Sequence, residues 1–365
     1  MIQKGIQCCE LTKQFDRLEP PSAGRSSATG MWVNYIAGLV RPSRRPDIYR
    51  PQRGNLTAVD HLDLTISKGE FFALLGSNGA GKTTLIKMLA TVLSPTKGTA
   101  FVNGYDVTKD NRKVRRSVAV VSTGGWLGFD LQLSIEWNLR YWAEVSGLDP
   151  TTARRRTGEI LDLVGLTSKA GESSSVLSGG MRQRLAIGKG LLVEAPILMM
   201  DEPTVGLDPH AANAMREFVK HSVNGGRGVT VVLTTQNMDE ADQLCDRIAI
   251  LDHGRIVALG SPWALKRDLV DTVIYVEGTG LTPGLMQVFR DRFHVRSAAF
   301  GLNAGSGRHW HRLHATGQRF EQEPMVTFLR VAGASDIVLK HVPPNLEDVY
   351  MSLIGREAQD GGSSQ

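Results

Sequence analysis

A glycine-rich stretch between an apolar run and a helical pattern constrains this chain most strongly. It matches the phosphate-binding pattern G-x-x-x-x-G-K-[ST]. Phe71–Leu75 before it is entirely apolar, which predicts a buried parallel strand, and apolar residues recur at helical spacing over 85–93 after it. The stretch is therefore expected to join a strand to a helix. Its residues are Gly76, Ser77, Asn78, Gly79, Ala80, Gly81, Lys82, Thr83 and Thr84.

The residue types in this stretch suit a bound triphosphate. Glycine at positions 76, 79 and 81 lets the backbone curl so that its N–H groups point inward with no side chain in the way. The helix that follows adds the positive end of its dipole. We expect Lys82 to reach the β- and γ-phosphates and the Thr83 hydroxyl to ligate Mg²⁺.

Composition sets the class of protein. At 365 residues, with 41% apolar and 22% charged residues, the chain has the composition of a soluble globular protein of one or two domains. Cys8, Cys9 and Cys245 form no plausible disulfide framework, which favours a reducing compartment. There is no apolar run long enough to span a bilayer and no opening signal peptide pattern. The net charge of +5 is mild and favours solvated basic surface over a nucleic-acid partner.

Two further motifs follow the glycine-rich stretch in the sequence. Ser178 is a good helix N-cap, and Gly179 and Gly180 leave backbone N–H groups bare at the predicted helix start. The run 197–202 is an apolar strand that ends in two acids, Asp201 and Glu202. Acids at the carboxyl end of a parallel strand lie where open α/β sheets bind ligands. Asp201 is expected to hold Mg²⁺ through water, and Glu202 to polarise an attacking water.

The order and spacing of these motifs resemble the nucleotide-binding subunit of an ABC transporter, over about Ile6 to Leu265. The resemblance implies an α/β P-loop ABC ATPase cassette, with a mixed sheet and a helical lobe. It implies that two cassettes, identical or related, face each other and hold ATP between the P-loop of one and the Ser178–Gly180 segment of the other. Asp208 would then lie at the dimer seam, and Phe15 would stack on adenine.

The run around Gln236, together with the closing segment 343–350, resembles the daunorubicin-resistance type of ABC-2 exporter ATPases. The expected partner is an integral membrane permease, and the expected location is the cytoplasmic face of the cell membrane. No nucleic-acid partner is expected. Two rival functions stay open: a soluble ABC ATPase that acts on ribosomes or DNA, and a nucleotide-gated subunit with little hydrolysis.

Two positions depart from the usual pattern of the family. Thr123 stands where the family usually has a glutamine, and its hydroxyl is a shorter candidate ligand for Mg²⁺ or water. Gln236 stands where the family usually has a histidine, and it can donate a neutral hydrogen bond to the γ-phosphate but cannot become cationic. We expect hydrolysis to persist, with Glu202 as the main catalytic residue and Gln236 beside it.

The remaining segments define the expected domain organisation. The cassette is assigned to 1–265, with an irregular insertion at 18–56 and a helical lobe at about 124–180. The pattern over 271–357 predicts a small α+β domain of βαββαβ order, ferredoxin-like in type, and the tail 358–365 is expected to be disordered.

Aromatic residues crowd the start of the predicted helical lobe. Trp137 and Tyr141 are four residues apart and are interpreted as part of the lobe core. Trp126 and Phe129 in the preceding loop either pack in that core or meet the permease, and the second interpretation is our hypothesis. The insertion contains an apolar segment, 31–40, followed by arginines, which is typical either of a surface loop or of a short helix at a membrane interface.

Overall fold

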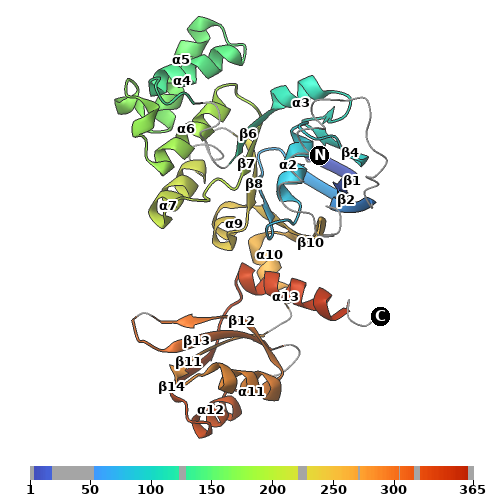
Figure 1. The fold of residues 1–365 in the computed structure, drawn as a ribbon, viewed down its shortest axis with the longest axis vertical. Helices are drawn as coiled ribbons and strands as arrows, with labels where there is room; N and C mark the ends of the chain where they lie inside the picture. The colour runs from blue at the N-terminus through green and yellow to red at the C-terminus, as the bar shows by residue number, and fades with distance from the viewer. Residues whose placement is uncertain are drawn as a thin grey trace, which may run out of the picture.

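The computed structural model of the chain describes residues 4–18, 53–122, 129–220, 228–269, 272–303, 305–315 and 321–360. A mixed sheet, an antiparallel sheet and a helical lobe lie together at one end of the molecule (Figure 1). A further sheet with its own helices lies at the other end. The α/β cassette predicted from the motifs is confirmed.

The central sheet carries the ligand motifs at the carboxyl ends of its parallel strands. Its strands are β3 (Phe71–Leu75), β6 (Val118–Ser122), β7 (Ile197–Asp201), β8 (Thr230–Thr235), β9 (Arg247–Asp252) and β10 (Arg255–Gly260), in the order β10-β9-β3-β8-β7-β6. β3 pairs in parallel with β8 and β9, and β7 pairs in parallel with β6 and β8. Every residue of β3 and β8 is buried, because central strands of such a sheet are covered on both faces.

An antiparallel sheet of order β2-β1-β4-β5 packs against the glycine-rich loop and its helix. Its elements and the helices beside it are β1 (Lys4–Leu18), β2 (Arg53–Ser67), β4 (Lys97–Val102), β5 (Tyr105–Asp106), α2 (Lys82–Leu89) and α3 (Asn111–Ser117). Strands β1 and β2 pair as far as Leu18 and Arg53. Both strands thus reach into the edges of the segment that was predicted to be irregular from 18 to 56. The predicted apolar helix at 31–40 lies outside the described residues.

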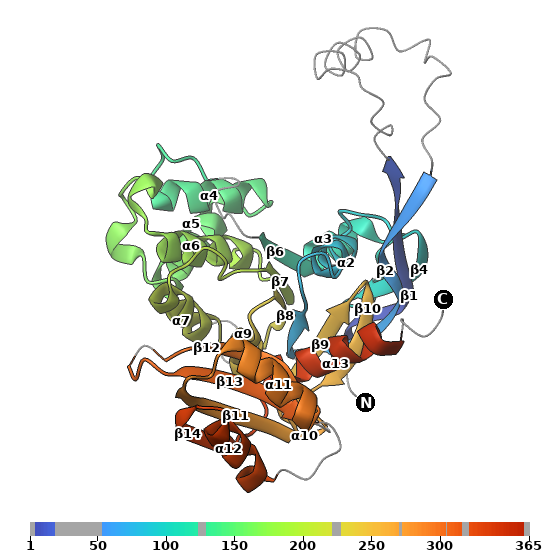
Figure 2. The ribbon, with the colours of Figure 1, turned by 60° about the horizontal axis from the view of Figure 1, so that its bottom comes forward.

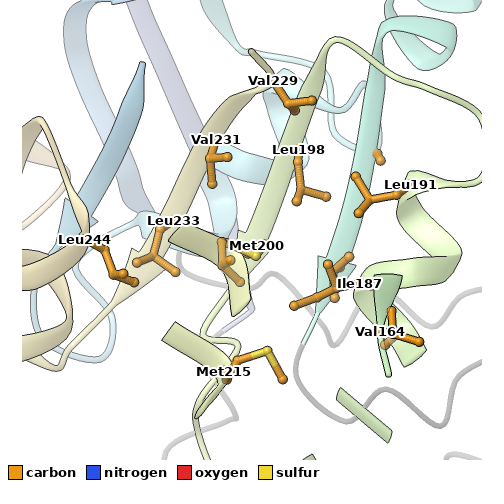
Figure 3. Close-up of a cluster of buried hydrophobic side chains, with 14 of the residues drawn as sticks. Val164, Ile187, Leu191, Leu198, Met200, Met215, Val229, Val231, Leu233 and Leu244 are labelled. Atoms are coloured by element: carbon orange, nitrogen blue, oxygen red, sulfur yellow. The ribbon is translucent and has the colours of Figure 1, made fainter. Parts of the chain in front are cut away.

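One apolar cluster joins the helical lobe to the central sheet. The helices concerned are α4 (Ile135–Val145), α5 (Pro150–Leu163), α6 (Gly179–Leu191), α7 (Pro209–Phe218) and α9 (Met238–Leu244). Ile187 and Leu191 of α6 share the cluster with Leu198 of β7, Met215 of α7 and Leu244 of α9 (Figure 3). Burial of each large aliphatic side chain contributes roughly 1.5–3 kcal/mol. The cluster therefore makes the lobe and the sheet one folding unit.

The aromatic residues of α4 do not pack as predicted from their spacing. Trp137 and Tyr141, interpreted as lobe core, are 57% and 50% exposed. Trp142 and Phe129 pack against the buried cluster instead, and the ammonium of Lys189 lies 4.1 Å from the centroid of the Trp142 ring. The i,i+4 spacing identified two residues on one helix face. Which face is covered depends on where α5 and α6 lie, and the spacing holds no information on that.

The C-terminal region has the predicted βαββαβ order. Its elements are β11 (Thr272–Thr279), α11 (Pro283–Phe293), β12 (Val295–Leu302), β13 (His309–Ala315), α12 (Gln322–Val331) and β14 (Ser335–His341). The strand order β12-β13-β11-β14 is that of a ferredoxin-like sheet. A short helix, α10 (Pro262–Arg267), comes before this region, and a final helix, α13 (Leu346–Asp360), follows it. The helix α13 continues past the start of the tail that was expected to be disordered, and residues 361–365 lie outside the described part of the chain.

The helix α13 attaches the C-terminal sheet to the cassette, and it lies between the two in Figures 1 and 2. Leu346 and Val349 are buried in the apolar cluster of the cassette. Asp348 has no exposed surface and accepts hydrogen bonds from Arg312 Nε at 2.7 Å and from His314 Nε2 at 3.0 Å, both on β13. Burial alone would raise the pKa of Asp348, but the bonds from His314 and Arg312 outweigh it and lower the pKa to about 2.

Replacing Asp348 with asparagine should destabilise the chain most near neutral pH. The folded-state pKa of about 2 lies below the ordinary value of 3.8, so the carboxylate stabilises the fold above about pH 4 and this contribution is lost as the pH falls toward 2. We expect Asp348→Asn to lower the free energy of unfolding by roughly 2 kcal/mol at neutral pH. Denaturant unfolding at neutral pH and near pH 3 measures the difference between parent and variant.

The exposed carboxylate of Asp336 on β14 provides the matched control, Asp336→Asn. We expect this variant to follow the parent at both pH values. A penalty for Asp348→Asn that stays the same from neutral pH to pH 3 would show that the carboxylate does not carry the stabilisation.

Candidate functional site

The glycine-rich loop between β3 and α2 lies against two neighbouring strands at distances that only glycine allows. A Cβ on Gly76 would lie 2.4 Å from the carbonyl oxygen of Leu251, at the end of β9. A Cβ on Gly81, where φ is +103°, would lie 2.3 Å from the carbonyl oxygen of Ala58 in β2. The neighbouring strands thus fix the curvature of the loop. Its tip at 77–79 is exposed and open to a ligand.

Lys82 places a buried ammonium inside this loop. Its Nζ donates to the carbonyl oxygens of Gly76 at 2.8 Å and Ser77 at 2.9 Å, and lies 3.7 Å from Oε1 of Glu202. Burial lowers the pKa of Lys82, while the carboxylates of Glu202 and Asp201 act in the opposite direction. The positive charge is therefore held at the mouth of the loop by groups that a phosphate oxygen can replace.

Asp201 ends β7 within reach of α2. Its carboxylate accepts from the Thr83 hydroxyl at 3.0 Å and from the Thr234 hydroxyl at 2.5 Å. Carboxylate and hydroxyl oxygens are the hard ligands that Mg²⁺ prefers, usually together with water and phosphate oxygens. Thr83 and Asp201 therefore fit a magnesium site beside the loop. Among the described residues, no group of three or more acidic, histidine or cysteine side chains forms another candidate cation site.

Glu202 follows Asp201 in a strained backbone conformation. Its φ of 52° lies in the left-handed region, which residues other than glycine rarely adopt. The backbone N–H of Glu202 donates to the carbonyl oxygen of Thr234 at 3.0 Å and lies 3.1 Å from its hydroxyl oxygen. This turn leads the Glu202 side chain back toward Lys82 and the loop. Strain of this kind, held in place by neighbouring bonds, is typical of functional sites.

Thr234 is the site residue that the sequence interpretation missed. It connects both acids, since its hydroxyl donates to Asp201 and its carbonyl accepts from Glu202. The signal was present in the sequence, because the otherwise apolar run of β8 ends in two threonines. Only the parallel pairing of β7 with β8 places Thr234 directly beside Asp201.

Gln236 follows β8 at the same edge of the sheet and is exposed. The backbone on either side of it is fixed: the N–H of Gly76 donates to the carbonyl oxygen of Thr235 at 3.4 Å, and the N–H of Asn237 donates to the Thr235 hydroxyl at 2.9 Å. The loop that carries Gln236 therefore adjoins the start of the phosphate-binding loop.

The segment 178–180 forms a capped and accessible helix start. Ser178 caps α6 by accepting from the N–H of Met181 at 3.3 Å, and both Ser178 and Gly179 are exposed. A Cβ on Gly180 would lie 3.1 Å from the Cβ of Ala211, so glycine lets α7 approach closely. Asp208 is exposed and caps α7 by accepting from the N–H of Ala211 at 2.9 Å.

The predicted residues fall into two groups in space. The loop 76–84, Asp201, Glu202 and Gln236 meet at one edge of the central sheet. In Figures 1 and 2, α6 and α7 lie on the other side of β6, β7 and β8 from α2. Ser178 and Asp208, both exposed, cap the starts of these two helices. Phe15 lies on β1, opposite Leu56 of β2, with the ammonium of Lys13 5.1 Å from its ring centroid. Thr123 and Trp126 lie outside the described residues.

Comparison with known proteins identifies the family. The family model described as ABC transporter matches residues 59–205. The daunorubicin/doxorubicin resistance ATP-binding protein DrrA of Streptomyces peucetius is 44% identical over 217 residues, which cover 60% of this chain and 64% of that protein. The linearmycin resistance ATP-binding protein LnrL of Bacillus subtilis is 33% identical over 312 residues, 84% of this chain and 96% of that protein. The Nod factor export ATP-binding protein I of Cupriavidus pinatubonensis is 32% identical over 314 residues, 85% of this chain and 90% of that protein.

Solved structures share the fold. The protein cbiO1 from Clostridium perfringens, described as part of the ABC transporter complex cbiONQ, superposes with a TM-score of 0.57 at 21% identity over 73% of this chain and 92% of its own. The ATP-binding cassette MJ0796, in a dimeric post-hydrolysis state bound to ADP and Pi, superposes with a TM-score of 0.53 at 21% identity, over 70% of this chain and 98% of its own. Together with the family match and the long alignments above, the geometry leads to one conclusion: the chain belongs to the family of ABC transporter ATP-binding proteins.

Proposed function

We propose that this chain binds and hydrolyses ATP as the energy-supplying subunit of an ABC-2-type exporter. The observation that carries the proposal is the meeting of Lys82, Thr83, Asp201 and Glu202 below the open tip of the loop. The Lys82 ammonium suits a bound triphosphate, and the Glu202 carboxylate suits an attacking water. The names of the relatives refer to daunorubicin/doxorubicin resistance, linearmycin resistance and Nod factor export, which supports an export role.

Each residue has a distinct part in the proposed reaction. The Lys82 ammonium exchanges its carbonyl partners for β- and γ-phosphate oxygens. Thr83 and Asp201 would hold a magnesium ion, which would neutralise charge on the phosphate oxygens. The Glu202 carboxylate accepts a hydrogen bond from the attacking water and takes its proton as the water oxygen bonds to the γ-phosphorus and the bond from that phosphorus to the ADP oxygen breaks. Gln236 donates its amide N–H toward the γ-phosphate.

A second cassette would complete this site. Segment 178–180 offers bare N–H groups at the start of α6, with Ser178 and Gly179 exposed, but α6 lies across the sheet from the helix α2 that follows the loop of its own chain. Two chains arranged head to tail would bring this segment of one copy onto the triphosphate held by the other. We propose a homodimer or a pair with a related cassette, with Asp208 of each copy at the seam. ATP would then close the interface and hydrolysis would open it.

A separate membrane protein would provide the transport pathway. Within the described ranges, no helix has the length and apolar character needed to cross a bilayer. Trp137, Tyr141 and Val145 form an exposed apolar face of α4, with 57%, 50% and 58% of their surfaces open. Exposed aromatic residues grouped on one helix face are typical of interface anchors. We propose that the permease docks on this face, at the cytoplasmic side of the membrane.

Removal of the Lys82 ammonium should abolish tight nucleotide binding. We expect Lys82→Ala to weaken the binding of Mg·ATP by about 2–3 kcal/mol, roughly a hundredfold in Kd, because a buried charge-assisted contact is lost. Equilibrium dialysis at low temperature measures it. Lys87→Ala removes an exposed lysine from the same helix and should leave the Kd unchanged. Parental affinity in Lys82→Ala would refute the assignment of the phosphate site.

Neutralisation of Glu202 should stop hydrolysis while binding persists. We expect Glu202→Gln to lower kcat by roughly 10²–10⁴-fold, since the amide no longer polarises water, with little change in affinity for ATP. Phosphate release under single-turnover conditions measures the chemical step. Glu10→Gln is the control, because Glu10 also has a positive φ, of 47°, but lies on β1. Hydrolysis by Glu202→Gln at the parental rate would assign the chemistry to another residue.

The exposed face of α4 gives a test of the partner. We expect Trp137→Ala combined with Tyr141→Ala to abolish co-purification with the integral membrane protein that the parent chain pulls down, while basal ATPase activity is retained. Trp263→Ala removes a comparably exposed tryptophan from α10, at the other end of the cassette, and should not affect co-purification. Retained binding by the double variant would place the docking site elsewhere.

A further inference from the structure

Glu240 is a buried acid that the reaction described above does not use. It lies in α9, which begins directly after the loop that carries Gln236, and only 1% of its surface is exposed. Acidic side chains are rarely buried to this extent unless a specific partner or role keeps them there. Its backbone is fixed as well, because its N–H donates to Oδ1 of Asn237 at 3.1 Å.

The Glu240 carboxyl lies between two loops that serve different parts of the site. The hydroxyls of Thr235, before Gln236, and of Thr204, after Glu202, both contact it. Burial raises the pKa of Glu240, while these hydroxyls and the charge of Arg216 act in the opposite direction. The acid is thus held at a position where strand β8 and the loop after β7 meet.

Each of the two threonines leads directly to a functional residue. Thr235 accepts from the N–H of Asn237 through its hydroxyl at 2.9 Å, so that Gln236 lies within a closed turn. The carbonyl of Thr204 accepts from the N–H of Leu207 at 3.2 Å, and Leu207 is followed by Asp208. Through these two turns the Glu240 carboxyl is connected to the segments that carry Gln236 and Asp208.

Arg216 adds a third connection. It lies on α7, the helix capped by Asp208, and its charge acts on the Glu240 carboxyl. In the described part of the chain, Nε of Arg216 and Oε2 of Glu240 are both buried and both without a hydrogen-bond partner. A buried donor and a buried acceptor without partners each lower the free energy of unfolding, because each has lost its hydrogen bonds to water. A hydrogen bond between the two would remove both penalties. A closer approach of α7 to α9 would let these two atoms satisfy each other.

We propose that Glu240 is a positioning residue for ATP hydrolysis, which fixes the position of the loop that carries Gln236 relative to the loop that carries Asp208. When the cassettes close, Arg216 pairs with the Glu240 carboxylate. The inference rests on the proposed ATPase function and deepens it. In this proposal the Glu240 side chain connects Gln236, which faces the γ-phosphate, to Asp208 at the dimer seam. Both are thereby set in place together, and Glu240 itself does not touch the nucleotide.

Two substitutions of Glu240 test the proposal. We expect Glu240→Ala to lower kcat on the order of tenfold or more, and Glu240→Gln, which keeps the size and the hydrogen-bonding capacity of the side chain, to lower it by a smaller factor of about three. The Kd for a non-hydrolysable ATP analogue should change by less than about threefold in both, because the P-loop is untouched. If Glu240→Ala does not fold, the reduced kcat of Glu240→Gln at parental Kd is the deciding result.

Matched controls separate positioning from stability. Leu244→Ala removes a buried apolar side chain from the same helix, and should lower the melting temperature while kcat stays at the parental value. Asp242→Asn removes an acid of the same helix that pairs with Lys266 instead, and should also leave kcat unchanged. If Leu244→Ala lowers kcat as much as Glu240→Ala, the effect is structural and the proposal is wrong.

A double-mutant cycle tests the part of Arg216. If the two side chains act as one unit, Glu240→Gln combined with Arg216→Gln should cost no more in kcat than the more severe single variant. If the reductions in kcat of the two single variants add up fully in the double variant, Arg216 and Glu240 do not act as a pair. Parental kcat, within about twofold, in both Glu240 variants would overturn the proposal as a whole. A parent chain that shows no turnover would instead refute the proposed ATPase function, so the two failures are distinguishable.

Discussion

The buried ammonium of Lys82 is the interaction on which the site depends. Two carbonyl oxygens of the loop and a more distant carboxylate, that of Glu202, compensate its charge in a place that solvent scarcely reaches. A buried cation without such partners would be costly, so the loop must curl and Glu202 must turn inward. The curl is possible because glycine at 76 and 81 lets the strands β9 and β2 come close. The strained φ of Glu202 is held by Thr234 in the neighbouring strand.

The parts of the cassette are coupled through the end of the central sheet. Strands β7 and β8 bring Asp201, Glu202, Thr234 and Gln236 to one edge, and α9 starts there. Helix α13 contacts α9 on one side and, through Asp348, holds β13 of the C-terminal sheet on the other. The site, the loops proposed to face a second cassette and the C-terminal region are thus linked by packed helices.

Much of this was predictable from the sequence, and the failures have physical causes. The apolar runs of β3 and β7 identified buried strands, because that signal is local, and their polar ends predicted the ligand edge. The exposure of Trp137 was not predictable, since the i,i+4 rule does not say which helix face a distant segment covers. Thr234 was missed for the same reason: its role depends on its pairing partner in β7. The strands β1 and β2 extend further than expected because they stabilise each other as a pair.

The sequence by itself determined the chemistry of this protein: a phosphate-binding loop, a capped glycine pair and two adjacent acids, each recognisable within a few residues. These features are local because backbone curvature, capping and charge are set by near neighbours. The tertiary structure alone decided which of them meet. It brought Lys82 to Glu202, placed helix α6 on the other side of the sheet from α2, and buried Glu240 between two loops, because strand pairing and burial join residues that are far apart in the chain.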